Sequence, residues 1–197
     1  MKNCLLCGVG GQGTVLASRI IAAAAMLRGC DARTAETIGM AQRGGCVVSH
    51  VRIGEVPSEK VTSPLIPEGQ ADVLIGFEPG EALRNLPYLK KDGALIVCSR
   101  EVRPVTASLG QSGYRGEDAV NFLKDHILRC YVIDPDDIIT QCGSPKVLNV
   151  ALVGAMAGAG DMGLGLEDIE NALALRLKPK LLDMNRRALA LGAAEVR

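Results

Sequence analysis

Glycines crowd a short stretch near the N-terminus with a spacing typical of turns that bind phosphate. The stretch Gly8–Gly13 reads GVGGQG, which contains the pattern G-x-G-x-x-G. Glycine allows a positive φ and a close approach of backbone to ligand. The amino end of a following helix adds unpaired N–H groups and partial positive charge, which suit a diphosphate. The candidate binding residues are Gly8, Gly10, Gly11, Gln12 and Gly13.

This glycine turn also has a purely structural interpretation. The glycines can simply let the first helix pack closely on a sheet, or let a partner subunit dock. A dinucleotide-binding turn needs an acidic residue about 20 positions later, for which Asp31 and Glu36 are the candidates. The chain contains no G-x-x-x-x-G-K-[ST] sequence, which argues against a P-loop ATPase.

A second small-residue stretch, Glu36–Gly45, surrounds a single arginine. Arg43 is followed by Gly44 and Gly45, so its guanidinium can approach a ligand or a backbone closely. Guanidinium is the natural partner of carboxylate and phosphate. If this stretch follows a strand parallel to the first, it lies beside the glycine turn, where α/β proteins bind ligands. The alternative is a structural Arg43, paired with Glu36 or with a partner chain.

The remaining reactive side chains favour structural roles. Cys4 and Cys7 form C-x-x-C inside an apolar run, where positions three apart point to opposite faces of a strand, so we expect buried thiols. Cys142, before a helix, is the candidate for a more reactive thiol. Two histidines are too few for a three-ligand zinc site, and His50 is expected at an edge or interface. The run of acids after Ile133 is expected to cap the next segment rather than bind metal.

Composition excludes several classes of function. The 197 residues include 22 basic and 22 acidic side chains, so the net charge is zero, which argues against nucleic acid or an acidic membrane as partner. Aromatic residues make up only 3%, too few for base-stacking platforms. No apolar stretch is long enough to span a membrane. An odd number of cysteines, seven, fits reduced thiols and a cytoplasmic location.

Strand and helix patterns alternate along the chain. Apolar or alternating runs predict strands at residues 4–9, 30–37, 46–53, 73–77, 94–98 and 129–133. Helical spacing is expected at residues 13–28, 78–88, 117–128, 146–159 and 167–191, with a break at Pro179. Within the first helix, one face is expected to contain Leu16, Ile20, Ala23, Ala24 and Leu27. In the predicted helix at residues 146–159, Gly154 and Gly158 are expected to let the backbone of another segment pack closely.

This alternation predicts the fold class. Strands that alternate with helices form a mostly parallel sheet with helices on both faces, in a three-layer, Rossmann-like α/β arrangement. The continuous apolar strands agree, because parallel strands are buried on both sides. We expect one domain over residues 1–197, with a C-terminal helical extension from about residue 145.

Several stretches together resemble one family. They are the glycine turn, residues 39–52 around Arg43, residues 63–66 before the strand at 71–75, residues 77–84, and Asn149. This set resembles the gamma-type domain of 2-oxoacid:ferredoxin oxidoreductases and is most similar to the small (beta) subunit of the indolepyruvate-type members. The resemblance covers nearly the whole chain and is far more specific than the glycine turn alone.

The resemblance implies a subunit that is inactive alone. Complexes of this family decarboxylate a 2-oxoacid on Mg²⁺-bound thiamine diphosphate, pass electrons through iron–sulfur clusters to ferredoxin and release an acyl-CoA. The implied partner is a large subunit that carries thiamine and clusters, and coenzyme A is a possible ligand of this chain. The resemblance assigns no catalytic residue here. The matching positions are Gly8, Gly10, Gly11, Gln12, Gly13, Arg43, Gly44 and Gly45.

Three interpretations therefore stay open at the level of sequence. The first is a subunit of a complex that oxidises indolepyruvate or another aryl pyruvate, with a pyruvate-type gamma subunit as its variant. The second is a stand-alone protein that binds NAD(P) or FAD through the glycine turn. The third is an assembly module whose glycine loops only dock a partner.

Overall fold

The computed structural model of the chain describes residues 1–39, 45–102 and 113–196. Its strands are β1 (Lys2–Val9), β2 (Ala32–Ile38), β3 (Cys46–Ile53), β4 (Ala71–Gly76), β5 (Leu89–Cys98) and β6 (Cys130–Ile133). Its α-helices are α1 (Thr14–Leu27), α2 (Pro79–Arg84), α3 (Gly116–His126), α4 (Pro135–Cys142), α5 (Leu148–Ala159), α6 (Leu166–Arg176) and α7 (Leu182–Ala194). None of the helices in these ranges is long and apolar enough to cross a membrane.

The strands form a single mixed sheet in the order β2-β3-β1-β4-β5-β6. Strand β3 runs antiparallel to both β1 and β2, whereas β1, β4, β5 and β6 pair in parallel. Strand β2 therefore runs in the same direction as β1. We call the edge at which β1, β4, β5 and β6 end the carboxyl edge, and the opposite one the amino edge. The β2–β3 connection turns back at the carboxyl edge.

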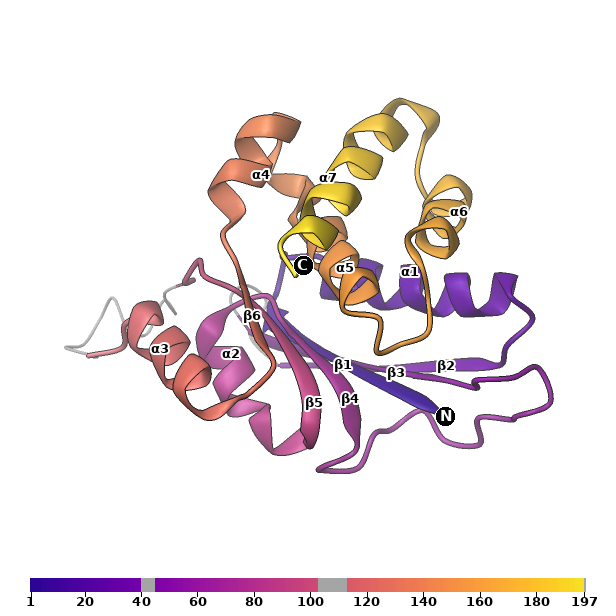
Figure 1. Cartoon of the computed structure of the whole chain (residues 1–197), viewed down its shortest axis with the longest axis horizontal. Helices are drawn as coiled ribbons and strands as arrows, with labels where there is room; N and C mark the ends of the chain where they lie inside the picture. Colours follow the sequence, from indigo (N-terminus) through magenta and orange to yellow (C-terminus); the bar gives the residue numbers. More distant parts are fainter. Residues whose placement is uncertain (40–44, 103–112, 197) are drawn as a thin grey trace.

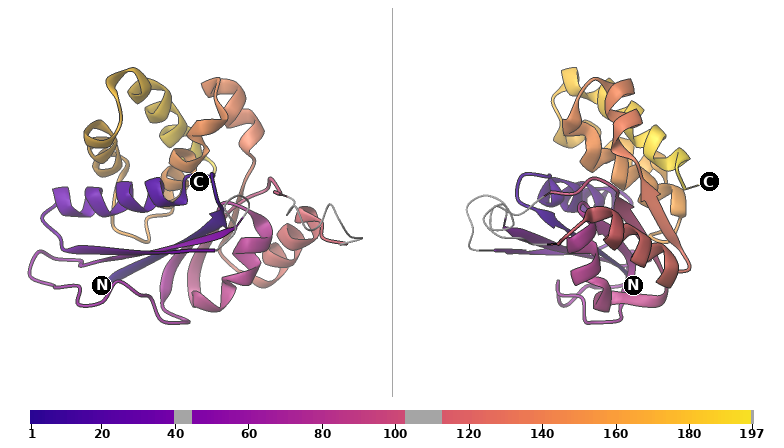
Figure 2. Two further views of the ribbon diagram at one scale, coloured as in Figure 1. Left: turned by 180° about the vertical axis from the view of Figure 1, so that it is seen from behind. Right: turned by 90° about the vertical axis from the view of Figure 1, so that its left-hand side faces the viewer.

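Helices cover both faces of the sheet, as the alternating pattern predicts (Figures 1 and 2). One apolar core includes Cys4 and Leu6 of β1 together with side chains of α1, α5, α6 and α7. The other includes Leu5 and Cys7, together with side chains of α2 and α3. Because successive residues of a strand point to opposite faces, β1 contributes to both cores. The predicted three-layer, mostly parallel α/β fold is confirmed.

The buried side of α1 differs from the one expected. Leu16 and Leu27 are 37% and 51% exposed, so their placement on the core face is wrong. The helix instead buries a surface of mostly small side chains, among them Ala17, Ile20, Ile21, Ala24 and Ala25. Helix α1 packs against the sheet on one side and against α5 and α6 on the other. The short alanine side chains allow these close approaches, and the larger leucines remain outside.

Close backbone packing joins α5 to α7. A β-carbon built on Gly154 would lie 2.1 Å from the carbonyl oxygen of Leu189, and one on Gly192 would lie 1.9 Å from that of Ala151. The predicted close approach at Gly154 is thus confirmed, and the helix that packs against it is α7 of the same chain. The predicted break at Pro179 is also confirmed, because a short 3-10 turn, Pro179–Leu181, separates α6 from α7.

One helix was missing from the sequence prediction. Helix α4 follows β6 directly, and the Asp134 side chain accepts a hydrogen bond from Asp136 N at its amino end, 3.0 Å away. The expectation that these acids cap the next segment is therefore confirmed for Asp134. The helix has only eight residues, which explains why its periodicity is hard to recognise.

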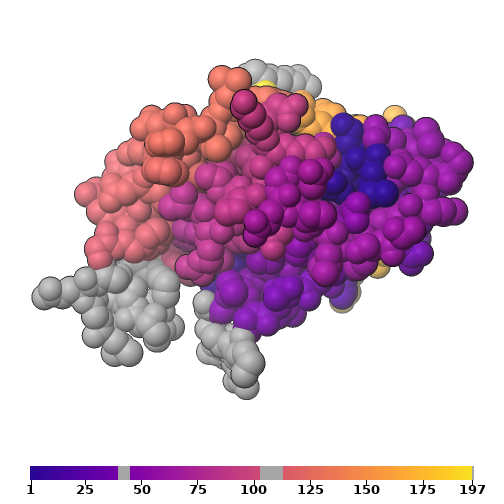
Figure 3. Space-filling model, turned by 90° about the horizontal axis from the view of Figure 1, so that it is seen from below, coloured from indigo at the N-terminus to yellow at the C-terminus, as the bar shows by residue number. Residues whose placement is uncertain are grey.

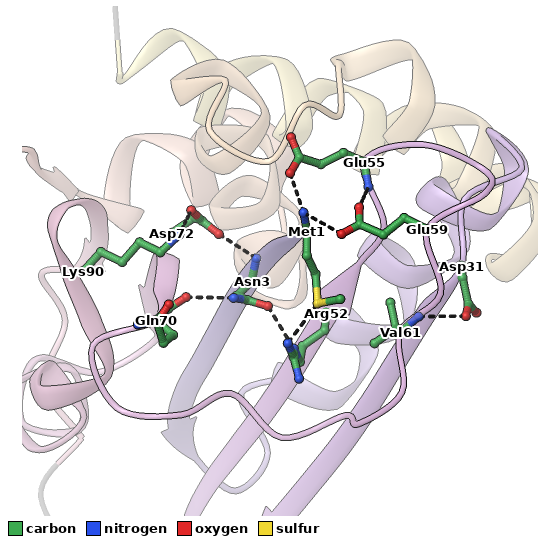
Figure 4. A network of polar contacts seen from close by, with 10 residues as sticks. All are labelled: Met1, Asn3, Asp31, Arg52, Glu55, Glu59, Val61, Gln70, Asp72 and Lys90. Atoms are coloured by element: carbon green, nitrogen blue, oxygen red, sulfur yellow. Dashed lines mark hydrogen bonds and ion pairs between the residues drawn. The ribbon is translucent and has the colours of Figure 1, made fainter.

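A polar network closes the amino edge of the sheet (Figure 4). Asn3 lies at its centre: its amide donates to the carbonyl of Gln70 (2.8 Å) and accepts from Arg52 Nε (3.0 Å), and its backbone N donates to Asp72 (2.8 Å). Arg52 also donates to the carbonyl of Ser63. These bonds hold the irregular connection from β3 to β4, residues 54–70, which we call the crossing. On the surface, the N-terminal residues, indigo in Figure 3, lie next to the purple residues of this part of the chain.

Candidate functional site

The glycine turn lies at the carboxyl edge, between β1 and α1. Gly11 and Gly13 have φ values of +99° and +87°, which only glycine adopts without strain. Gly8 serves packing, because a β-carbon there would come within 2.7 Å of Phe77 Cβ. Gly10 and Gly11 are exposed at the tip of the turn. The turn therefore combines tightly packed ends with an accessible tip.

The Gln12 side chain joins the glycine turn to the end of β4 by hydrogen bonds. Its Oε1 accepts from the backbone N of Val9 (2.7 Å), and its Nε2 donates to the carbonyl of Phe77, after β4 (2.9 Å). The backbone N of Gln12 also donates to the carbonyl of Val9 (3.2 Å). Gln12 was selected from the sequence as a candidate ligand residue, and its amide is bonded to the backbone of the protein.

The far end of the turn lies against a helix from the C-terminal part of the chain. A β-carbon built on Gly13 would lie only 2.7 Å from Nδ2 of Asn149, in the first turn of α5. Asn149 is 6% exposed. The resemblance drew attention to Asn149, but its contact with the turn follows only from the packing of two segments about 135 residues apart.

The β2–β3 connection also reaches the turn, as predicted. The backbone N of Gly10 donates to the carbonyl of Gly45, 2.9 Å away, and Gly39 N donates to the carbonyl of Cys46 (2.8 Å). Both ends of the small-residue stretch thus lie at the carboxyl edge. Arg43 and Gly44 lie outside the described residues, so their roles as ligand residues remain predictions.

Neither candidate for the ribose-binding acid lies where a dinucleotide fold places it. Asp31 precedes β2 and lies at the amino edge, opposite the glycine turn, where it accepts from Val61 N (3.1 Å). Glu36 lies on β2, which antiparallel β3 separates from β1, and its carboxylate is 3.5 Å from the Ser18 hydroxyl beneath α1. In the dinucleotide fold the acid-bearing strand is adjacent to the glycine-turn strand. The strand order therefore weighs against that use of the turn.

Two buried carboxyl groups lie next to the turn, at the end of β4. Glu78, 3% exposed, caps α2 by accepting from Glu81 N (2.9 Å), and it also accepts from the hydroxyl of Tyr114. Burial and the neighbouring Glu78 raise the pKa of Tyr114 far above its usual range. This bond holds Tyr114, which lies just before α3, at the carboxyl edge.

Glu81 has an unusual environment. It is 7% exposed, and its Oε1 is 2.9 Å from Arg84 Nη1, but its buried Oε2 has no hydrogen-bond partner in the described ranges. Burial raises the pKa of this carboxyl group, and the like charge of Glu78 acts in the same direction, while Arg84 opposes both. Sequence spacing gave no signal for these groups, because burial depends on how α2 packs against β1, β4 and β5.

Cys4 and Cys7 are placed as expected, whereas the expectation that His50 lies at an edge or interface is wrong. Cys4 and Cys7 are fully buried on opposite faces of the sheet, and burial raises the pKa of both thiols. His50 is 5% exposed, accepts from the backbone N of Ile66 (3.2 Å) and meets the ring of Tyr88 edge-on, and burial lowers its pKa. Its imidazole is therefore an interior structural group.

The described residues do not fit a metal centre or an iron–sulfur cluster. No group of three or more His, Cys, Asp or Glu side chains there is placed to hold a metal ion. All seven cysteines are free. The carboxyl edge instead offers backbone N–H groups, an asparagine amide and two buried carboxyl groups. The N–H groups and the asparagine amide are donors that suit an anionic ligand, and the edge as a whole can bind a partner surface.

Comparisons with known proteins find relatives over nearly the whole chain. The chain is 41% identical to indolepyruvate oxidoreductase subunit IorB of Archaeoglobus fulgidus over 96% of its length and 92% of that protein. It is 35% identical to IorB of Thermococcus kodakarensis, over 96% of this chain and 93% of the relative. It is 27% identical to the common gamma subunit of pyruvate and ketoisovalerate oxidoreductases of Pyrococcus abyssi, over 92% of this chain and 89% of that one.

Solved structures share the fold. Pyruvate oxidoreductase subunit PORC of Thermotoga maritima matches with a TM-score of 0.72 at 23% identity, covering 100% of this chain and 97% of that one. The 2-oxoglutarate:ferredoxin oxidoreductase of Magnetococcus marinus matches with a TM-score of 0.73 at 18% identity, covering 99% of this chain but 31% of that longer one. The family model for pyruvate ferredoxin/flavodoxin oxidoreductases matches residues 3–195. The chain belongs to this family of oxidoreductase subunits and domains.

Proposed function

We propose that the chain is the small subunit of an indolepyruvate:ferredoxin oxidoreductase. The complex would decarboxylate indolepyruvate or another aryl pyruvate oxidatively, reduce ferredoxin and form the corresponding acyl-CoA. One observation carries the choice of substrate class: identity to the indolepyruvate subunits reaches 41%, against 27% to the gamma subunits of pyruvate enzymes over a similar span. A pyruvate-type gamma subunit is the alternative within the same family.

The chemistry is divided between this chain and a large partner. The described residues hold no cluster of metal ligands, so we assign thiamine diphosphate, its Mg²⁺ and the iron–sulfur clusters to the partner subunit. Held by that partner, thiamine diphosphate would supply the electron sink that decarboxylation of a 2-oxoacid needs. This chain would contribute a shaped surface at the carboxyl edge, built from the glycine turn and the β2–β3 connection. Its free thiols fit a cytoplasmic complex.

Coenzyme A is the ligand that we assign to this edge. The exposed tip at Gly10 and Gly11 permits a close approach of backbone to a diphosphate, and Arg43 lies in the connection that ends at Gly45, beside the turn. Substitution Arg43→Ala is expected to raise the KM for coenzyme A in the complex and to leave assembly intact. Lost assembly with an unchanged KM would favour a docking role for this loop.

Reconstitution tests the proposed function directly. The purified chain is expected to be colourless and unable to reduce a viologen dye with indolepyruvate and coenzyme A. Addition of the large partner subunit should produce dye reduction, with a higher kcat/KM for indolepyruvate than for pyruvate. A preference for pyruvate would instead favour the alternative, a pyruvate-type gamma subunit. Dye reduction by the chain alone would overturn the proposal.

A nicotinamide titration separates the complex from a stand-alone dehydrogenase. Because the strand order separates β2 from β1, we expect NADH to leave the melting temperature of the chain unchanged. A ligand present at 100 times its Kd would stabilise the fold by about 2.7 kcal/mol, which a melting curve detects easily. Clear stabilisation by micromolar NADH would instead favour a dinucleotide-binding protein.

A further inference from the structure

Large apolar side chains gather on the outer surface of α1 and at the neighbouring end of α6. Helix α6 packs against α1 (Figure 1). Four of the ten large apolar side chains that the described residues expose lie on these two helices, namely Leu16, Met26, Leu27 and Leu175. Met26 is 61% exposed and Leu175 is 68% exposed. Exposed apolar side chains that gather in one place mark a surface on which another molecule packs.

These side chains have the spacing of a helix-packing surface. Leu16, Ala23 and Leu27 are separated by seven and four residues, so at about 100° per residue they lie within about 20° of one line along α1. Between the two helices, Ala23, Met26, Leu27 and Leu175 line a groove of about 370 Å³. We call the five residues Leu16, Ala23, Met26, Leu27 and Leu175 the α1/α6 surface. A helix laid along it would follow α1 for about 16 Å, or three turns.

The charges beside the α1/α6 surface are basic. Four basic side chains on these two helices or just beyond α6 form no ion pair with an acid in the described part of the chain: Arg19, Arg176, Lys178 and Lys180. Arg176 itself lines the groove. Asp168 lies seven residues before Leu175, on the same side of α6, but its carboxylate is already 3.6 Å from Nη1 of Arg28. The surface therefore attracts an apolar segment that carries acidic side chains.

Two other occupants fit this surface less well. A two-fold dimer brings the same surface of each copy together, so it would place Arg19 and Arg176 against the same basic side chains. An anionic membrane is contacted by protruding side chains, whereas Ala23, only 7% exposed, makes this groove recessed. A groove of this kind receives the side chains of a protein partner.

The other apolar groove, between α2 and α3, is a weaker candidate. Leu83 and Phe122 line it together with Arg115 and Asp118, so the charges beside it have both signs. The Phe122 ring also stacks on His126, with 4.0 Å between the ring centroids. Its main apolar side chain therefore already has a partner within the chain, unlike Met26 and Leu175.

We propose that the α1/α6 surface docks an amphipathic helix of the large partner subunit. Its apolar side chains enter the groove, and its acidic side chains lie toward Arg19 and Arg176. The identity of the partner rests on the proposed function. Helix α1 begins at the glycine turn, and Met26 and Leu27 lie in its last turn, at the opposite end. Docking at that end leaves the tip at Gly10 and Gly11 accessible.

Sedimentation velocity of the full chain mixed with the purified large subunit measures assembly without depending on turnover. Leu175→Glu should weaken assembly by at least about tenfold, because it places a negative charge in the apolar groove opposite an acidic partner. The melting temperature of the free chain should not change, since the Leu175 side chain is mostly exposed. Leu128→Glu, at a 99% exposed position between α3 and β6, is the matched control and should assemble like wild type.

The salt dependence of assembly tests the acidic character of the partner. The affinity of the wild-type chain should fall as the concentration of sodium chloride rises. Combined Arg19→Gln and Arg176→Gln substitutions should weaken assembly and reduce this dependence on salt. Arg187→Gln, at an exposed position of α7, should change neither property. An unchanged salt dependence in the double variant would argue against an acidic partner.

Three results would overturn this docking surface. They are wild-type affinity in Leu175→Glu, self-association of the chain alone that Leu175→Glu abolishes, or binding to phosphatidylglycerol vesicles that the same substitution abolishes. The proposed function fails separately. A complex that assembles through Leu175 but does not oxidise indolepyruvate would remove the function and keep the surface. No assembly of the wild-type chain with the large subunit would overturn both.

Discussion

At the scale of single residues, Gln12 joins the two strand ends nearest the glycine turn. Its side chain bonds the backbone N of Val9 and the carbonyl of Phe77. We expect Gln12→Ala to lower the free energy of unfolding by about 1–3 kcal/mol, because both backbone groups lose a partner. Denaturant unfolding monitored by circular dichroism measures this change. Gln141→Ala, at an exposed position of α4, should change stability by less than about 0.5 kcal/mol; equal effects of the two substitutions would contradict this role.

Glu81 predicts a pH dependence of stability. Its pKa in the folded chain is raised above the ordinary value of 4.5, so the native state holds the proton more tightly than the unfolded chain does. Stability therefore falls as the pH rises from about 4.5 through the raised pKa. We expect Glu81→Gln to remove this loss, so that its stability relative to wild type increases with pH across that window.

Unfolding curves between pH 4 and pH 8 measure this difference. Glu68→Gln, at an exposed position of the crossing, provides the control and should follow the wild-type curve. A constant difference between Glu81→Gln and wild type over the whole range would show that the buried carboxyl group does not titrate as its surroundings require.

At the scale of elements, the contact between α5 and α7 depends on the absence of side chains. Gly154→Ala would bring a methyl group to about 2.1 Å from the Leu189 carbonyl, so the helices must separate or unfold locally. Overpacking of this kind typically costs about 1–3 kcal/mol. Thermal unfolding should show a lowered melting temperature. Gly113→Ala, at an exposed position where a β-carbon meets nothing within 4 Å, should be nearly neutral, and an equal loss there would argue against backbone contact as the cause.

The elements also show where sequence reasoning succeeds and where it fails. Strand β3 was predicted with its observed bounds, because alternation and flanking glycine act locally. Leu16 and Leu27 were assigned to the core because large apolar side chains are usually buried. The narrow space beneath α1 instead holds alanine side chains, and the two leucines are exposed. The turn at Gly8–Gly13 was found from its spacing alone. Asn149, Glu78 and Tyr114 join it only through tertiary packing, which local patterns do not encode.

At the scale of the whole molecule, the two edges of the sheet are built differently. The amino edge is closed by side-chain bonds around Asn3, whose amide links β1 to β3 and to the crossing at residues 54–70 (Figure 4). The carboxyl edge presents the exposed glycine tip at Gly10 and Gly11, with Gly45 of the β2–β3 connection bonded to it. We therefore expect that stability can be altered at the amino edge without loss of the function proposed for the carboxyl edge.

Asn3→Ala tests that separation. Loss of its bonds to Gln70 and Arg52 should lower the free energy of unfolding by about 1–3 kcal/mol. Under the proposed function, indolepyruvate turnover in the reconstituted complex should stay within twofold of wild type at temperatures well below the melting point. Gln70→Ala is the matched control, because Asn3 uses only its backbone oxygen, and it should affect neither property. A loss of turnover in Asn3→Ala that exceeds its unfolded fraction would mean that the sheet couples the two edges, because its strands run directly from one edge to the other.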